Sequence, residues 1–187
     1  NIVTGTGPQA GDALARHIDV DVLAFTGSGP VGRALLEASA QSNLKRVYLE
    51  LGGKSPCVVF ADADLAAAAK AVAGGIFRDS GQVCIAASRV LVERSVHRDF
   101  VDLLVQAAEA MRVGDPLDLR TQAGAIATEA QMHKILAAIR AGQAAGAALR
   151  TGGQRLLAET GGHHIAPPLL YNAPPDRALV REELVGP

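Results

Sequence analysis

The first 52 residues alternate short apolar runs with helical stretches, and glycine-rich turns stand between them. Residues 1–3 form an apolar run that predicts a strand, and Pro8 at a first helical position predicts a helix to about residue 17. Strands joined by helical crossovers pair in parallel, so the pattern predicts an α/β fold with three layers, helices covering parallel sheets. The other elements expected in this part are strands at 22–25 and 45–51 and a helix at 31–40.

The alternation restarts after Gly53, and we expect a boundary between a first domain of residues 1–52 and a second of residues 53–187. Asp62 or Asp64 is predicted to cap an alanine-rich helix that ends near Phe77. The other elements expected here are strands at 57–60, at 89–92 and near 148–149, a loop at 78–83, helices at 96–111 and 128–145, and an extended edge segment at 164–171.

Composition excludes several function classes. Eighteen Lys and Arg against 19 Asp and Glu leave a net charge of −1, which gives no field to attract nucleic acid or an anionic membrane. No apolar run approaches the roughly 20 residues that span a bilayer. Two cysteines and five histidines have no disulfide or metal-ligand spacing, so we expect a cytoplasmic protein without a metal site. The pair His163-His164 lies in a polar, glycine-rich stretch and is expected at the surface.

The spacing Gly27-x-Gly29-x-x-Gly32 follows a predicted strand and opens a predicted helix, and Glu50 stands 18 residues after Gly32. This is the pattern of a dinucleotide-binding turn with its ribose-binding acid. Pro30 inside the motif leaves the alternative open that the turn simply needs glycine. A phosphate-binding loop at Gly53 is rejected, because Tyr48 stands where that loop needs its first glycine.

Cys84 follows a helix in a glycine-containing loop, where a thiolate could attack a carbonyl carbon. The alternative is a small buried thiol, and that is the interpretation kept for Cys57. Glu50 ends an apolar strand, and strand ends in parallel sheets face ligand crevices. A solvated strand end is the alternative there.

Four strings in order resemble the aldehyde dehydrogenase superfamily, and the resemblance covers the whole chain. One such string is weak evidence, whereas four in register are strong. They are Phe25-Thr26-Gly27-Ser28, Leu49-Glu50-Leu51-Gly52-Gly53-Lys54-Ser55-Pro56, Gly81-Gln82-Val83-Cys84 and Glu182-Glu183-Leu184-Val185-Gly186-Pro187.

The resemblance implies NAD(P)-dependent oxidation of a small-molecule aldehyde to an acid. Cys84 would be the nucleophile that forms a thiohemiacetal and then a thioester, and its backbone N–H an oxyanion donor. Glu50 would be the general base for thioester hydrolysis, which favours hydrolysis over transfer to coenzyme A.

The resemblance also implies how NAD or NADP would be held, and it reassigns Gly29 and Glu50 away from the dinucleotide fingerprint. The implied cofactor contacts are Gly27, Ser28 and Gly32 at the pyrophosphate, Gly7 and Pro8 at the adenine pocket, Leu51 near the nicotinamide, and Glu183, Gln131 and Lys134 at the nicotinamide ribose.

Two departures from the family pattern stand out. Val185 replaces the usual Phe, so the apolar wall beside the ribose would be smaller. The family's upstream half, with the Asn that completes the oxyanion hole, would precede Asn1. We therefore expect an internal segment holding the C-terminal half of an NAD(P)-binding Rossmann-like domain and a catalytic domain incomplete at its C-terminus.

Assembly and substrate class follow from the resemblance alone. It implies a homodimer or homotetramer, and residues 75–86 with Arg181-Glu182-Glu183 are similar to gamma-glutamyl-aminobutyraldehyde dehydrogenases. The alternative function is a truncated, non-catalytic module of the same fold that binds a nucleotide or a partner.

Overall fold

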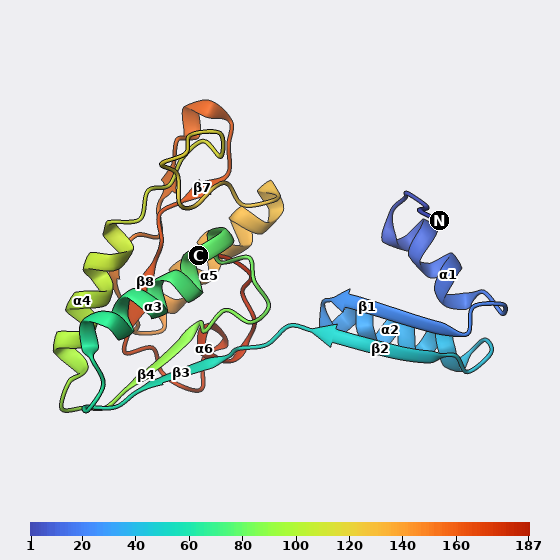
Figure 1. The fold of residues 1–187 in the computed structure, drawn as a ribbon, viewed down its shortest axis with the longest axis horizontal. Helices are drawn as coiled ribbons and strands as arrows, with labels where there is room; N and C mark the ends of the chain where they lie inside the picture. Colours follow the sequence, from blue (N-terminus) through green and yellow to red (C-terminus); the bar gives the residue numbers. More distant parts are fainter. The chain divides into compact units, whose positions relative to one another are not determined.

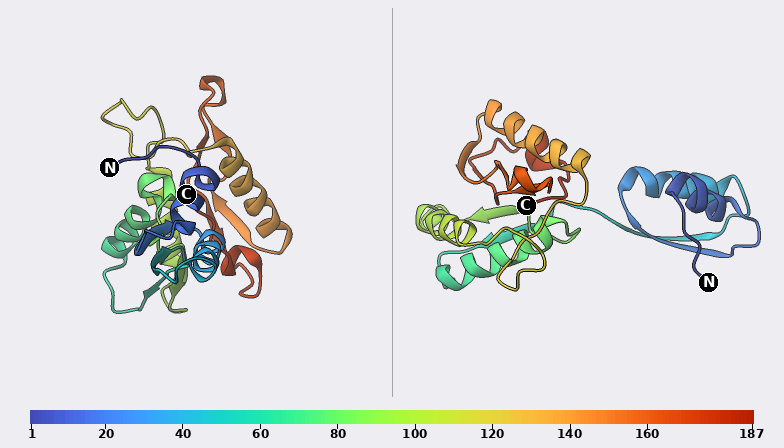
Figure 2. Two further views of the ribbon diagram at one scale, coloured as in Figure 1. Left: turned by 90° about the vertical axis from the view of Figure 1, so that its right-hand side faces the viewer. Right: turned by 90° about the horizontal axis from the view of Figure 1, so that it is seen from above.

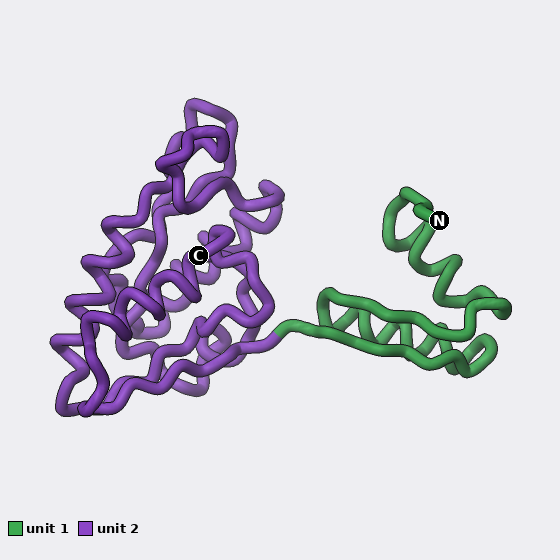
Figure 3. Tube along the Cα trace, in the orientation of Figure 1, with its two compact units in different colours: residues 1–52 green, residues 53–187 purple.

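The computed structural model describes all residues from Asn1 to Pro187. They divide into two compact units, Asn1–Gly52 and Gly53–Pro187 (Figure 3).

The first unit is built on two parallel strands joined by a helix (Figure 1). Strand β1, Val22–Gly27, pairs with β2, Arg46–Leu51, in a register that runs from Val22 opposite Arg46 to Gly27 opposite Leu51. Helix α2, Gly29–Ala40, is the crossover, so the predicted parallel pairing is confirmed here. A π-helical turn at Gly7–Gly11 and helix α1, Asp12–Arg16, precede β1.

A buried lysine fastens α1 to the rest of this unit. Lys45 is 5% exposed, and its ammonium donates to the Ala15 carbonyl oxygen at 2.6 Å and to the Ser42 hydroxyl at 3.0 Å. The Ser39 hydroxyl donates to the Lys45 carbonyl at 2.7 Å. Since the carbonyls at a helix end lack partners within the helix, the lysine both satisfies one of them and is itself satisfied.

The predicted strand at residues 1–3 is wrong. Ile2 is 94% and Val3 71% exposed, and neither lies in a strand. An apolar run becomes a strand only where a neighbouring strand takes up its backbone hydrogen bonds. The sheet of this unit consists of β1 and β2 alone, so residues 1–3 pair with neither strand.

In the second unit, helices cover strands on both sides. Strand β3, Pro56–Val59, pairs in parallel with β4, Arg89–Val92. Helix α3, Leu65–Phe77, and helix α4, His97–Glu109, pack on this pair, and α5, Glu129–Ala144, lies on the other side of the strands (Figure 2).

Two clusters of buried side chains form the core of this unit. Phe77 and Phe100, at 2% and 0% exposed, anchor the cluster between α3, α4 and the strands. Burial of a Phe side chain stabilises a fold by about 1.5–3 kcal/mol. The second cluster lies under α5 and consists of Ile126, Met132, Ile135, Ile139 and Ile165.

The later strands are short and pair antiparallel. Strand β5, Ala148–Thr151, pairs with β8, Leu169–Tyr171, and β6, Arg155–Leu156, pairs with β7, His164–Ile165. The parallel arrangement therefore does not extend to these pairs. Elements not predicted are β6 and three short helices, at Arg78–Gly81, Ala158–Thr160 and α6, Ala178–Arg181.

The expectation that His163 and His164 lie at the surface is wrong for His164. Its side chain points into the unit from β7, and the residue is 6% exposed. Neither ring nitrogen has a hydrogen-bond partner. None of the helices is long and apolar enough to cross a membrane.

Candidate active site

The carboxyl ends of β1 and β2 bring four of the predicted site residues to one edge of the first unit. Thr26 lies opposite Glu50 and Gly27 opposite Leu51 in the parallel ladder. Ser28 follows directly and is the N-cap residue of α2. Because β1 and β2 run the same way, Glu50 and the start of α2 share the edge at which parallel sheets bind ligands.

The start of α2 suits a phosphate. The Ser28 hydroxyl makes no capping hydrogen bond, Ser28 is exposed, and the first N–H groups of a twelve-residue helix have no partners within the helix. Gly32 is buried, and a Cβ there would lie 3.0 Å from a methyl carbon of Leu51. The missing side chain lets α2 pack closely on β2. These residues therefore fit the pyrophosphate of a dinucleotide.

Gly7 and Pro8 begin the π-helical turn before α1, and both are exposed. The Thr6 carbonyl accepts from the N–H groups of Gln9 and Ala10 at 3.1 and 2.9 Å, which shapes the turn. A Cβ on Gly7 would meet no atom within 4 Å. The turn is thus an open surface of the first unit.

In the second unit, Cys84 lies in a loop whose start has an unusual backbone. Asp79, Ser80 and Gly81 all have φ in the left-handed region, between 51° and 68°. The buried Ser80 hydroxyl donates to the Gly124 carbonyl at 3.0 Å. A Cβ on Gly81 would lie 2.1 Å from the Gly186 oxygen, so only glycine lets the two backbones pass this closely.

Gln82 fastens the same loop on its other side. Its side-chain oxygen accepts from the Ala127 N–H at 2.8 Å. Its side-chain nitrogen donates to the backbone carbonyl oxygens of Asp79 at 3.2 Å and Ala125 at 3.4 Å. Two residues later, Cys84 is free and exposed, whereas Cys57 in β3 is half-buried. The loop is therefore held by its backbone and by Gln82 while the Cys84 thiol stays accessible.

The Glu183 segment, residues 183–186, is held by hydrogen bonds at Glu183 and at Val185. The Gly53 N–H donates to Glu183 Oε1 at 3.2 Å, and the Gln131 amide donates to the Val185 carbonyl oxygen at 2.6 Å. Gln131 is in the first turn of α5, and Lys134 is exposed one turn further on. The four predicted ribose-side residues thus come from α5 and from this one segment.

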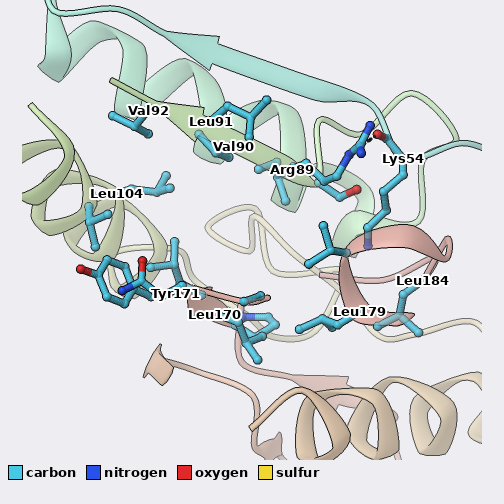
Figure 4. Close-up of a pocket in the computed structure, with 18 of the residues that line it drawn as sticks. Lys54, Arg89, Val90, Leu91, Val92, Leu104, Leu170, Tyr171, Leu179 and Leu184 are labelled. Carbon is cyan, nitrogen blue, oxygen red and sulfur yellow. Dashed lines mark hydrogen bonds between the residues drawn. The ribbon is translucent and has the colours of Figure 1, made fainter. Parts of the chain in front are cut away.

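A cavity of about 560 Å³ opens beside this segment, between β4, α4 and β8 (Figure 4). Its wall is mostly apolar, with Lys54 and Arg89 at one end, and Cys84 does not line it. Burial lowers the pKa of Lys54 below its ordinary value, the charge of Arg89 lowers that pKa further, and Glu183 acts against both. This cavity of the second unit is therefore not the pocket of the candidate nucleophile.

The rejection of a phosphate loop at Gly53 is confirmed, since strand β3 and no helix follows Lys54 and Ser55. No group of three or more His, Cys, Asp and Glu side chains is arranged to hold a metal ion.

The comparisons with known proteins identify the family. The model of the aldehyde dehydrogenase family matches residues 1–187, so the chain belongs to that family. It is 44% identical to the mouse (Mus musculus) protein named "Aldehyde dehydrogenase, cytosolic 1" over all 187 residues, which are 37% of that protein. The chain thus spans little more than a third of the relatives it matches.

Solved structures agree with this assignment and confirm the fold class. The gamma-glutamyl-gamma-aminobutyraldehyde dehydrogenase of Burkholderia cenocepacia superposes with a TM-score of 0.93 at 46% identity, over 96% of this chain and 36% of that one. The indole-3-acetaldehyde dehydrogenase AldA of P. syringae, solved as a mutant in complex with NAD+, gives 0.96 at 42% identity, over 98% and 37%.

Sequence reasoning gave no role to Gln82, Lys54 or Arg89, although two of them stand inside the motifs. The side chains of Gln82 and Arg89 bond backbone groups 45 and 35 residues away in the chain. A polar residue beside a motif glycine is the signal that could have singled out Gln82 and Lys54, whereas Arg89 stands in no motif.

Proposed function

We propose that the protein is an NAD(P)-dependent aldehyde dehydrogenase that oxidises an aldehyde to a carboxylic acid, with Cys84 as nucleophile and Glu50 as general base. The observation that carries this proposal is the exposed Cys84 thiol on a loop fastened by Gly81 and Gln82, in a chain that belongs to the family from end to end. Residues 1–52 would belong to the cofactor domain and residues 53–187 to the catalytic domain, in agreement with the two compact units.

The reaction begins on Cys84. Its thiolate adds to the aldehyde carbon, a C–S bond forms, and the carbonyl π electrons move to oxygen, toward which the Cys84 backbone N–H donates. NAD or NADP, when bound, supplies the acceptor for the hydride that leaves this carbon, which leaves a thioester on Cys84.

Glu50 acts in the second half. Its carboxylate takes a proton from water as the water oxygen attacks the thioester carbon, and the thiolate of Cys84 leaves with the C–S electron pair. A positioned general base typically contributes about 10²–10⁴-fold to such a step. The products are the free acid and the regenerated thiolate.

The cofactor residues divide between the two units. Gly7 and Pro8 would line the adenine side, and Gly27, Ser28 and Gly32 would bind the pyrophosphate, for which the open start of α2 is suited. Leu51 would contact the nicotinamide, and Glu183, Gln131, Lys134 and Val185 would surround its ribose. The NAD+ complex of the P. syringae relative supports the choice of cofactor.

Substrate, assembly and location rest on the relatives. The similarity to the B. cenocepacia enzyme supports an aminobutyraldehyde-type aldehyde as substrate. A homodimer or homotetramer is the assembly that the family resemblance implies. The name of the mouse relative supports a cytoplasmic location.

The test is a burst experiment on the full-length protein with NAD and an aldehyde. We expect Glu50→Gln to give a rapid burst of one NADH per site followed by turnover about 10²–10⁴-fold slower than in the wild type. Cys84→Ser should abolish both phases, and Cys57→Ser is the control that keeps both. Equal loss of burst and turnover in Glu50→Gln would assign Glu50 to an earlier step. A wild-type protein that binds NAD and oxidises no aldehyde would favour the non-catalytic module.

A further inference from the structure

The Glu183 carboxylate is held by a hydrogen bond from the backbone. Its hydrogen bond comes from the Gly53 N–H at 3.2 Å, and the residue is half-buried. Gly53 itself lies where the chain enters the second unit, before β3 begins at Pro56. The direction of the Glu183 carboxylate therefore depends on what holds residues 53–55.

Arg89 holds those residues. Its Nε donates to the Lys54 carbonyl oxygen at 2.7 Å, and its backbone N–H donates to the Ser55 oxygen at 3.3 Å. Arg89 is the first residue of β4 and lies opposite Pro56 in the parallel ladder. Arg89 thus binds the carbonyl groups of the two residues that follow Gly53.

We infer that Arg89 is a positioning residue for Glu183, which it serves through the Gly53-Lys54 backbone. The inference rests on the proposed function, because it gives Glu183 the nicotinamide ribose as its partner. If the guanidinium were lost, the Lys54 peptide would lose a charge-assisted hydrogen bond, and the Gly53 N–H would no longer be fixed. Glu183 would then be free to turn away from the ribose.

The electrostatics of the three side chains agree with this arrangement. Burial lowers the pKa of Lys54, the positive charge of Arg89 lowers it further, and Glu183 raises it. The Lys54 ammonium therefore interacts with both Arg89 and Glu183. Figure 4 shows Lys54 and Arg89 together at one end of the cavity, near Leu184.

A double-mutant cycle on the full-length protein tests the inference, with the affinity for NAD or NADP measured by isothermal titration calorimetry. We expect Arg89→Gln to weaken cofactor binding about tenfold, the loss typical of one charge-assisted hydrogen bond. In the Glu183→Gln background the same substitution should change the affinity less than about twofold, because the two residues act in series. Arg89→Lys, which keeps a donor, should recover most of the affinity.

The matched control is Arg155→Gln. Arg155 also donates to a backbone carbonyl, that of Gly162 at 3.3 Å, but it lies in β6 and should leave cofactor affinity unchanged. Circular dichroism checks that each variant folds, and if Arg89→Gln does not fold, Arg89→Met, which keeps the aliphatic stem but has no donor, supplies the cycle. A tenfold loss in both backgrounds, or none in either, overturns the inference while the proposed function stands. A wild-type protein that neither binds the cofactor nor oxidises an aldehyde overturns both.

Discussion

Gln131 and Val185 are joined by the shortest hydrogen bond that reaches the Glu183 segment, from the side-chain amide to the carbonyl oxygen at 2.6 Å. Gln131 lies in the first turn of α5, where Thr128 caps the helix by accepting from the Gln131 N–H at 3.2 Å. A rigid helix end is thereby connected to a segment without regular structure. Within the second unit, Gln131 is therefore a support for the segment, and its proposed contact with the cofactor would come in addition.

Gln131→Leu should loosen residues 183–186 without unfolding α5. The lost hydrogen bond is worth about 0.5–1.5 kcal/mol, so amide exchange in this segment should accelerate about 2- to 12-fold. Hydrogen–deuterium exchange read by mass spectrometry measures it. The control is Gln143→Leu on the same helix, since Gln143 is exposed and makes no side-chain hydrogen bond. Unchanged exchange in Gln131→Leu would contradict the supporting role.

Gly81→Ala should be among the most destabilising glycine substitutions in the second unit. Gly81 has φ of 68°, and a Cβ would lie 2.1 Å from the Gly186 oxygen, so both the backbone and the neighbouring segment must move. We expect a loss of about 3 kcal/mol or more, measured by urea unfolding.

Gly74→Ala is the matched control for Gly81→Ala. Gly74 lies inside α3, and a Cβ there meets nothing within 4 Å. Alanine is the better helix former, so this variant should gain about 0.5–1 kcal/mol. If both variants changed stability by the same amount, the close approach of the Gly81 and Gly186 backbones would not be the cause.

Local patterns predicted the elements that local interactions form. Apolar residues at helical spacing located the helix that became α4, for example, because Phe100 and Leu104 recur on the face that packs into the core. The same reasoning failed at Ile2, whose apolar character indicates burial but which needs a strand partner to become one. Pairing is a property of the whole unit and cannot be read from three residues.

The contacts between site residues could not be predicted from local sequence patterns, for a related reason. The motifs marked Glu183 and Gly53 separately, yet the hydrogen bond between them joins residues 130 positions apart. Arg89 and Lys54 are 35 apart. Such contacts depend on how β3, β4 and the Glu183 segment pack together, and the spacing of residues in the sequence does not indicate that packing. Chemical roles could be proposed for single residues from the sequence, whereas the contacts that hold those residues in place could not be predicted.

Asp64→Ala tests which of two acids caps α3, a choice that the sequence left open between Asp62 and Asp64. In the structure Asp64 Oδ1 accepts from the N–H groups of Ala66 and Ala67 at 3.1 and 3.0 Å. Removal of such a cap costs about 0.5–2 kcal/mol. Asp62 is also exposed but makes no such bond, so Asp62→Ala should change the free energy of unfolding by less than about 0.5 kcal/mol. The reverse order in a urea titration would assign the cap to Asp62.

Glu93 should make the second unit sensitive to acid. Its carboxylate accepts from the Ser95 hydroxyl at 2.7 Å and from the Ala61 N–H at 2.8 Å, and these two bonds, the first more strongly, lower its pKa below the ordinary value. Because the folded-state pKa lies below the unfolded one, the stabilisation is complete above the usual carboxyl pKa of about 4.3 and is lost as the pH falls through the folded-state value.

Glu93→Gln removes this titration while it keeps an acceptor for one of the two donors. We expect the variant to be less stable than the wild type at pH 7 and the difference to shrink steadily below pH 4.5, in thermal unfolding followed by circular dichroism. Glu159→Gln is the control, because Glu159 is exposed and makes no side-chain hydrogen bond. A Glu93→Gln deficit that stays constant from pH 7 to pH 3 would mean that the carboxylate charge is not what the Ser95 and Ala61 donors stabilise.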